Sequence, residues 1–447
     1  MGLKSPFFVI EFAMQDTIYA PSSAIGGAVA VIRLSGPLCR KLSETLFSRD
    51  ITLAPRQLSY ARLLEEQGGT VDDVMAVFLP APKTYTGEDM LEINCHGGYG
   101  IVQAVLSRLS RTGARPAEGG EFTRRAFLNG KMDLSAAEAV MDLIQARAEG
   151  SRKAALSQLH GALRKRMEGV QGLLVEALST LDAAMDYPEE LEADAAQTVP
   201  ALVKKALEQV RTLIDEGRRG RVLREGIRIA LAGRPNVGKS SLLNALLGQE
   251  RAIVTAIPGT TRDILDEETV LGGVPVRLVD TAGIRTAADE AERIGVNRAR
   301  EAMESADLIL LLLDGTRPLS QEDENLLALT AGHKRILVRS KGDLPQWEEA
   351  FGELTVSAQK GTGLEALKAR ILALAGPGDG QGCITNERHI HALEQAETAL
   401  MAALQAEEED CAATDLREAL HCLGAITGDD VDEAVLNDIF SRFCVGK

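Results

Sequence analysis

Aromatic residues, cysteines and long apolar runs are all scarce in this chain. Aromatic residues make up 4% of its 447 residues, which disfavours a protein that binds nucleic acid mainly by stacking bases on aromatic rings. No apolar run approaches the roughly 18 residues of a membrane-spanning helix, so no membrane span is expected. The six cysteines show no paired spacing, and the N-terminal segment, interrupted by Glu11, is not typical of a signal peptide. These absences favour a cytoplasmic protein in a reducing compartment.

Negative charge predominates, because 49 basic residues stand against 65 acidic ones and give a formal net charge of −16. Such a balance argues against non-specific coating of nucleic acid, although it leaves room for a local basic face. Residues 108–116 and 218–224 are rich in arginine and are the candidates for that face. Solvated arginines at the ends of segments are the simpler explanation of both.

The chain is long enough for several domains, and its hydrophobic patterning changes along its length. Residues 1–130 mix short β-like runs with a helix, which predicts an α+β domain. Residues 131–222 have helical periodicity, and this periodicity returns over 377–447. Between them, residues 223–376 alternate apolar strands with helix-length segments, as in a doubly wound parallel sheet. The sequence therefore predicts a multidomain α/β protein in which an α/β domain interrupts a helical one.

The helical segment carries recognisable start and stop signals. Ser135 and Glu138 have the spacing of a capping box, which predicts a helix start at that point. Pro188 is expected to break the helical run, which resumes after it.

A phosphate-binding loop begins at Gly233. Gly238, Lys239 and Ser240 follow it at the required spacing, after a predicted strand and at the start of a predicted helix that Gly248 closes. In that context backbone N–H groups cradle the β-phosphate, Lys239 bridges the β- and γ-phosphates, and the Ser240 hydroxyl binds Mg²⁺. We expect a nucleoside triphosphate site here.

Further polar residues follow the next predicted strand, at the edge where open α/β sheets bind ligands. Asp280 ends that strand and is expected to hold Mg²⁺ through water, and the Gly283 amide can sense the γ-phosphate. Thr260 and Thr261 lie in a polar loop that can close over the metal.

The base-recognition segment points to guanine. Asp343 can accept hydrogen bonds from both N1–H and N2–H of guanine, which adenine does not offer, and residues 357–363 can supply an N–H to guanine O6. The usual motif is Asn-Lys-x-Asp, but Ser340 takes the place of the asparagine. We expect guanine selectivity to survive this loss through Asp343.

A second departure concerns the attacking water. Many GTPases place Gln after Asp-x-x-Gly to orient that water, but here the position is Ile284, which cannot form a hydrogen bond. Asp289, Glu290 and Glu292 lie nearby and could replace the glutamine, or they could simply be the solvated start of a helix.

Several segments together resemble the MnmE family of bacterial and organellar tRNA modification GTPases. They are GRPNVGKSSLLNAL at 233–246, IPGTTRD at 257–263, DTAGIRTAADEAERIG at 280–295, YTGEDMLEINCHGG at 85–98, GEFTRRAFLNGKMDL at 120–134 and the final CVGK. The nucleotide motifs alone occur in many GTPases, whereas their combination with the first-domain segments and the terminal tetrapeptide is specific. The resemblance covers essentially the whole chain.

This resemblance implies a tetrahydrofolate-binding domain that also dimerises, a discontinuous helical domain and an inserted Ras-like GTPase domain. It implies a K⁺-dependent GTP hydrolase that acts on tRNA as a homodimer, in a heterotetramer with the flavoprotein MnmG. The reaction would add an aminomethyl or carboxymethylaminomethyl group to C5 of the wobble uridine, U34. The one-carbon unit would come from a 5-formyl- or 5,10-methylene-tetrahydrofolate.

The resemblance also assigns roles at the nucleotide site. Glu292 matches the acid that orients the attacking water, beside Lys239 as a catalytic residue. Ser240, Thr261 and Asp280 would hold Mg²⁺, and Asn236, Thr255, Ile257 and Thr260 would hold K⁺. The full set of predicted GTP-binding residues is Gly233, Asn236, Val237, Gly238, Lys239, Ser240, Ser241, Thr255, Ala256, Ile257, Pro258, Gly259, Thr260, Thr261, Asp280, Thr281, Ala282, Gly283, Ser340, Lys341, Gly342, Asp343, Ser357, Ala358 and Gln359.

In the same way Arg33, Glu92, Lys131 and Lys447 match folate-contacting positions. Cys444 is implied to matter for tRNA modification and not for GTP hydrolysis. Taken alone, a cysteine four residues from the end suggests prenylation, but the Gly-Lys ending is a poor prenylation signal.

Two other classes of function compete with this reading. A membrane GTPase carrying a prenyl group is disfavoured by the terminal glycine and lysine. A GTPase switch for ribosome assembly, with flanking domains that only dock RNA, is the main alternative.

Overall fold

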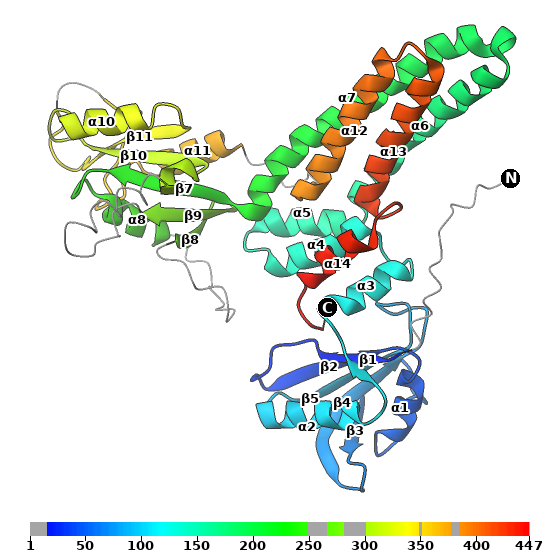
Figure 1. The fold of residues 1–447 in the computed structure, drawn as a ribbon. Coiled ribbons are helices and arrows are strands. Elements are labelled where there is room, and N and C mark those ends of the chain that lie inside the picture. Colours follow the sequence, from blue (N-terminus) through cyan, green and yellow to red (C-terminus); the bar gives the residue numbers. More distant parts are fainter. Residues whose placement is uncertain (1–15, 249–265, 281–300, 348–350, 377–383, 447) are drawn as a thin grey trace. The chain divides into compact units, whose positions relative to one another are not determined.

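The computed structural model describes residues 16–248, 266–280, 301–347, 351–376 and 384–446. The chain forms two compact units (Figure 1). One unit combines the chain up to Met141 with the chain from Gly424 onward, and the other consists of Asp142–Leu423. Both divisions fall inside helices, α4 (Leu134–Gln145) and α13 (Glu409–Thr427). The four segments expected from the sequence stay a prediction.

A six-stranded sheet with the order β3-β4-β5-β2-β1-β6 forms the first unit. Its strands are β1 (Ile18–Pro21), β2 (Val29–Ser35), β3 (Ser59–Leu64), β4 (Thr70–Leu79), β5 (Met90–His96) and β6 (Arg115–Pro116). All neighbours run antiparallel except β1 and β6. The unit also holds the helices α1 (Cys39–Thr45), α2 (Tyr99–Ser110), α3 (Glu121–Leu128) and α14 (Glu433–Ser441).

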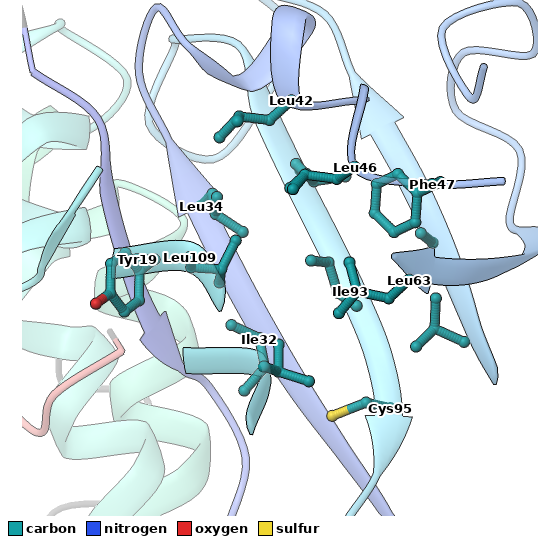
Figure 2. Close-up of a cluster of buried hydrophobic side chains, with 14 of the residues drawn as sticks. Tyr19, Ile32, Leu34, Leu42, Leu46, Phe47, Leu63, Ile93, Cys95 and Leu109 are labelled. Atoms are coloured by element: carbon teal, nitrogen blue, oxygen red, sulfur yellow. The ribbon is translucent and has the colours of Figure 1, made fainter. Parts of the chain in front are cut away.

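The side chains of β2 point alternately to the core and to the opposite face of the sheet. Ile32 and Leu34 pack with Leu42 of α1 and Leu109 of α2 in the main core, which Figure 2 shows. Because successive strand residues point to opposite faces, Arg33 points to the other face. The predicted α+β organisation of this region is confirmed, and the side chains on that other face become candidates for ligand binding.

In the second unit, long helices pack against one another. They are α5 (Glu149–Leu159), α6 (Ala162–Asp186), α7 (Pro188–Glu225), α12 (Glu387–Gln405) and α13. Pro188 stands at the first turn of α7, where its missing N–H costs nothing, so the predicted break is confirmed. No helix within the described residues is long and apolar enough to cross a membrane.

The predicted capping box at Ser135 is wrong. Helix α4 already begins at Leu134. Oδ1 of Asp133 accepts the Ala136 N–H at 2.9 Å and the Ser135 hydroxyl at 2.6 Å. The aspartate, one residue before the helix, therefore takes the part that the sequence spacing had suggested for the serine.

A second six-stranded sheet, ordered β12-β11-β10-β7-β9-β8, lies within the same unit. Its elements are β7 (Ile227–Gly233), α8 (Lys239–Leu247), β8 (Asp266–Leu271), β9 (Val274–Asp280), β10 (Leu308–Asp314), α10 (Gln321–Leu329), β11 (Arg335–Ser340), β12 (Leu354–Thr355) and α11 (Leu364–Ala375). Only the β8–β9 pair is antiparallel among these strands. Every residue of β10 is buried, as a central parallel strand requires. The doubly wound sheet predicted for this region is confirmed.

Candidate functional site: a nucleotide edge and a polar sheet face

The phosphate-binding loop connects β7 to α8. Gly233 has φ +146°, and a Cβ there would lie 2.6 Å from the Leu312 carbonyl oxygen, so no larger residue fits. Asn236 and Gly238 also have positive φ, at +60° and +108°. These conformations turn the chain tightly into the first turn of α8, where unpaired N–H groups and the helix dipole favour an anion.

Lys239 is held inside this loop. Its Nζ donates to the carbonyl oxygens of Gly233 and Arg234, the latter at 2.9 Å, and the residue is buried. Ser240 and Ser241 are exposed on the first turn of α8. A buried ammonium beside exposed hydroxyls supplies a fixed cation for phosphate oxygens and oxygen ligands for a hard metal ion.

An acidic partner of the loop was not predicted from the sequence. Nε of Arg234 lies 2.7 Å from Glu322, and its guanidinium also donates to Ser320 at the start of α10. The Ser320 hydroxyl forms a capping box with Asp323. These contacts tie the phosphate-binding loop to α10. The Ser-x-x-Asp spacing of Ser320 and Asp323 was the sequence feature from which the start of α10 could have been predicted.

The carboxyl ends of the parallel strands bring the other predicted residues to the same edge. Leu231 of β7 is paired with Asp280 of β9, and Leu312 of β10 with Gly233. On the other side of β10, Asp314 is paired with Ser340. The side chain of Asp280 lies outside the described residues, as do residues 255–261, 281–283, Asp289, Glu290, Glu292 and Lys447.

The base-recognition segment is fixed by neighbouring strands. The Ser357 hydroxyl donates to Oδ1 of Asp343 at 2.7 Å, and this bond holds the pKa of that carboxyl below its usual value. The Gly342 N–H donates to the Val356 carbonyl at 3.0 Å. Asp343 is therefore ionised and oriented, as an acceptor for two N–H groups must be. Ala358 and Gln359 follow directly in the adjoining turn.

Asp314 is a residue of this site that sequence reasoning missed. Nζ of Lys341 lies 2.8 Å from its carboxylate, and Thr316 donates to it through both its backbone N–H and its hydroxyl. Burial raises the pKa of Asp314, but Lys341 and Thr316 together lower it by more, so the carboxylate is ionised. Asp314 ends the apolar run of β10, as Ser340 ends β11, and this position could have placed it at the nucleotide edge from the sequence.

The first unit brings Arg33 and Glu92 together. They are direct partners across β2 and β5, and Nε of Arg33 donates to Oε1 of Glu92 at 2.9 Å. The Tyr85 ring lies against the guanidinium, with its centroid 5.7 Å from Cζ. Lys131 donates to the Pro82 carbonyl at 2.9 Å, in the loop that also carries Tyr85. Two of the predicted folate residues, Arg33 and Lys131, thus contact one loop, and the third, Glu92, pairs with Arg33.

An ionic network centred on the buried Arg125 contacts that loop through Glu88. Arg125 is fully buried and donates to Oδ1 of Asp16 at 2.8 Å, to Glu88 at 3.2 Å and to Glu121 at 3.2 Å. Arg115 pairs with Asp16 and Glu121 as well. The network was not predicted, because its members are far apart in the sequence and read individually as surface charges.

The C-terminal tail docks against β6 and the end of β1. Val445 forms an antiparallel bridge with Gly119, and the Gly120 N–H donates to the Cys444 carbonyl at 3.3 Å. A Cβ at Gly446, which has φ +94°, would overlap the carbonyl oxygen of Pro21. The Cys444 thiol is exposed, and Val445 lines a cavity of about 430 Å³ between α2 and the sheet edge.

The arginine-rich segments are largely occupied by ion pairs. Arg218 pairs with Glu394, and Arg224 pairs with Asp142. Arg115 pairs with Asp16 and Glu121. These pairs agree with the simpler explanation, arginines at segment ends that are paired with nearby acids.

A phosphate-binding loop and a guanine-type segment at one edge of a doubly wound sheet define a P-loop GTPase, an enzyme that hydrolyses GTP. The model of the MnmE helical domain matches residues 134–444, and that of the GTP-binding protein TrmE N-terminus matches residues 17–131. The chain belongs to the MnmE family of tRNA modification GTPases, as its motifs predicted.

Full-length relatives cover nearly the whole chain. The tRNA modification GTPase MnmE of Carboxydothermus hydrogenoformans is 42% identical over 460 residues, covering 97% of this chain and 100% of its own. That of Natranaerobius thermophilus is 40% identical over 456 residues, with the same coverage. Among solved structures, the G domain of the T. maritima FeoB iron transporter is 29% identical and covers 33% of this chain and 98% of its own, with a TM-score of 0.26.

Proposed function

We propose that this chain is a K⁺-dependent GTP hydrolase that modifies the wobble uridine of certain tRNAs together with the flavoprotein MnmG. It would act as a homodimer in the cytoplasm and add an aminomethyl or carboxymethylaminomethyl group at C5 of U34, with a tetrahydrofolate derivative as the one-carbon donor. The observation that carries the proposal is that one chain joins a guanine-nucleotide edge to a domain with a paired Arg33 and Glu92.

At the nucleotide edge the chain's own groups bind and orient GTP. The N–H groups of the loop and Lys239 bind the β- and γ-phosphates, and Asp343 selects guanine. Glu292 would hold the attacking water in line. The exposed hydroxyl of Ser240 and the position of Asp280 on the adjacent strand fit the oxygen ligands that Mg²⁺ requires, with Thr261 as the third. Bound Mg²⁺ would neutralise phosphate charge.

The proposed K⁺ site rests on Asn236, the one of its four ligands that the structure describes. Asn236 is exposed and has φ +60°, so it lies on the surface of the phosphate-binding loop. Its amide oxygen would hold K⁺ together with Thr255, Ile257 and Thr260. A cation there would supply the charge that an arginine finger supplies in other GTPases.

On the polar sheet face, Arg33 and Glu92 offer a donor beside an acceptor. A pterin ring has an amino group and a ring N–H next to a carbonyl oxygen, which is the complementary pattern. Glu92 would accept the N–H groups and Arg33 would donate to the oxygen, while Lys131 would bind the glutamate tail. Cys444 and Lys447 would act at this site through the tail.

The test is the steady-state rate of GTP hydrolysis in KCl and in NaCl at equal ionic strength. We expect strong acceleration by K⁺ alone. Equal rates in the two salts would remove the proposed cation site and its mechanism, while leaving the GTPase assignment intact.

A further inference from the structure

The loop from Thr84 to Asp89 is braced from below by buried side chains. The Thr86 hydroxyl lies 2.6 Å from the Ser35 hydroxyl, and Asn129 donates to the Thr86 carbonyl at 2.7 Å. Glu88 accepts from Ser35 at 2.6 Å and from the buried Arg125. These contacts tie the loop to both β2 and α3.

Tyr85 is the residue of this loop whose ring contacts Arg33. Its hydroxyl lies 2.9 Å from the hydroxyl of Thr123, a fully buried residue of α3. Its ring packs against the smaller apolar cluster that contains Ile18 and Phe122. Burial raises the pKa of Tyr85, and the Thr123 bond and Arg33 only partly offset this, so the ring is neutral at physiological pH.

Arg33 is held on two sides, and the rest of its guanidinium is left for a ligand. Glu92 accepts from its Nε, and the Tyr85 ring lies against its plane. Its side chain is 19% exposed. Among the described residues, neither terminal nitrogen of Arg33 has a hydrogen-bond partner, and neither does Oε2 of Glu92. A guanidinium fixed in this way presents two parallel N–H donors to a planar acceptor.

We propose that Tyr85 is a positioning residue for the tetrahydrofolate site and that it acts by fixing the plane of the Arg33 guanidinium. Thr123 holds Tyr85 in place from α3. This inference rests on the proposed use of a tetrahydrofolate. It also gives a role to the segments 84–89 and 120–125, whose sequence pattern had indicated only a family resemblance.

The experiment is calorimetric titration of the full-length protein with 5-formyltetrahydrofolate. Tyr85→Leu removes the ring and should weaken binding about tenfold, the effect of losing a partly desolvated cation–π contact. Tyr85→Phe keeps the ring and should stay within about threefold of wild type, because only the hydroxyl contact is lost. Tyr99→Leu, at an exposed tyrosine of α2, is the matched control and should bind as wild type does.

A double-mutant cycle separates positioning from general destabilisation. If Tyr85 acts through Arg33, Tyr85→Leu should have no further effect in an Arg33→Gln background. Additive losses would overturn the inference, as would unchanged binding by Tyr85→Leu. Tyr85→Met provides a second route if Tyr85→Leu does not fold, and because it also removes the ring it should weaken binding about tenfold.

The rate of GTP hydrolysis serves as an internal control in the same preparations. It should be unchanged in Tyr85→Leu, since the nucleotide edge is built from other residues, whereas KM for the tetrahydrofolate in tRNA modification should rise. A wild-type protein that does not bind 5-formyltetrahydrofolate would overturn the proposed folate site, and this inference with it. Wild-type binding that Tyr85→Leu leaves intact would overturn the inference alone.

Discussion

Replacing Gly446 by alanine tests whether the docked tail is needed for tRNA modification. Gly446 has φ +94°, and a Cβ there would overlap the Pro21 carbonyl oxygen, well inside the 3.0 Å that real Cβ contacts respect. Both partners are backbone, so the tail would have to move by about 1 Å to restore van der Waals separation. No side-chain rotation can relieve the overlap.

The magnitude follows from what holds the tail. The bond from the Gly120 N–H to the Cys444 carbonyl and the bridge between Gly119 and Val445 together contribute about 1–3 kcal/mol. An alanine at positive φ costs about 1–2 kcal/mol before the overlap is counted. This backbone strain alone is comparable to the docking energy, and the overlap with the Pro21 carbonyl adds to it, so the docked tail should become the minor state. We expect tRNA modification to fall by at least about tenfold.

Gly68→Ala is the matched control. Gly68 lies in the same unit at φ +93°, and a Cβ there meets nothing within 4 Å. It therefore carries the same backbone strain without the overlap. Hydrogen exchange of the Gly120 amide should quicken in Gly446→Ala and not in Gly68→Ala, and nucleoside mass spectrometry should report the loss of modification. Normal modification alongside fast exchange at Gly120 would refute the role of the tail, and unchanged exchange would refute the steric argument.

Three further predictions concern other parts of the chain. Asp343→Ala should lower GDP affinity about a hundredfold, to the level of ADP, in calorimetry; a retained preference for GDP would contradict the guanine assignment. Glu292→Gln should reduce kcat for GTP hydrolysis about 10²-fold or more with GDP binding unchanged, so a wild-type kcat would rule out its role. Arg125→Met should destabilise the first unit by about 2–3 kcal/mol in neutral urea unfolding, because Glu88 loses its buried partner and Asp16 and Glu121 keep only Arg115. Burial raises the pKa of Asp16 and Glu121, but the neighbouring arginines lower it by more. The stabilisation is therefore present above pH of about 4 and is lost as the pH falls through the lowered pKa values. A destabilisation by Arg125→Met that stays constant down to acidic pH would contradict this account.

The nucleotide edge could be predicted because its signals are local. A glycine-rich loop between a strand and a helix has few possible conformations, and Gly233 and Gly238 adopt the positive φ that it needs. Strand ends could be read from apolar runs that stop at a polar residue, as at Asp280 and Ser340. Once the sheet is parallel, these ends must share one edge.

Contacts set by register and long-range packing could not be read in the same way. Asp314 faces Lys341 because β10 and β11 pair in one register, and the sequence does not state that register. Arg125 meets Asp16 across 109 positions of the chain. The prediction of a capping box at Ser135 was wrong for a local reason, because Asp133 accepts the helix N–H one residue before the helix. Each of these depends on a partner that folding brings close.

The contacts of Ser340 explain how the base-recognition segment keeps its shape without the usual asparagine. Its hydroxyl donates to the Leu313 carbonyl at 3.1 Å, and its carbonyl accepts the Gly315 N–H at 3.3 Å, so Ser340 fastens β11 to β10. The segment is further held by Lys341 on Asp314. An amide at position 340 is therefore not needed to shape the loop that presents Asp343. Under the proposed function, guanine selection depends on one oriented carboxylate, and the Ser357 hydroxyl that holds it matters more than the missing asparagine.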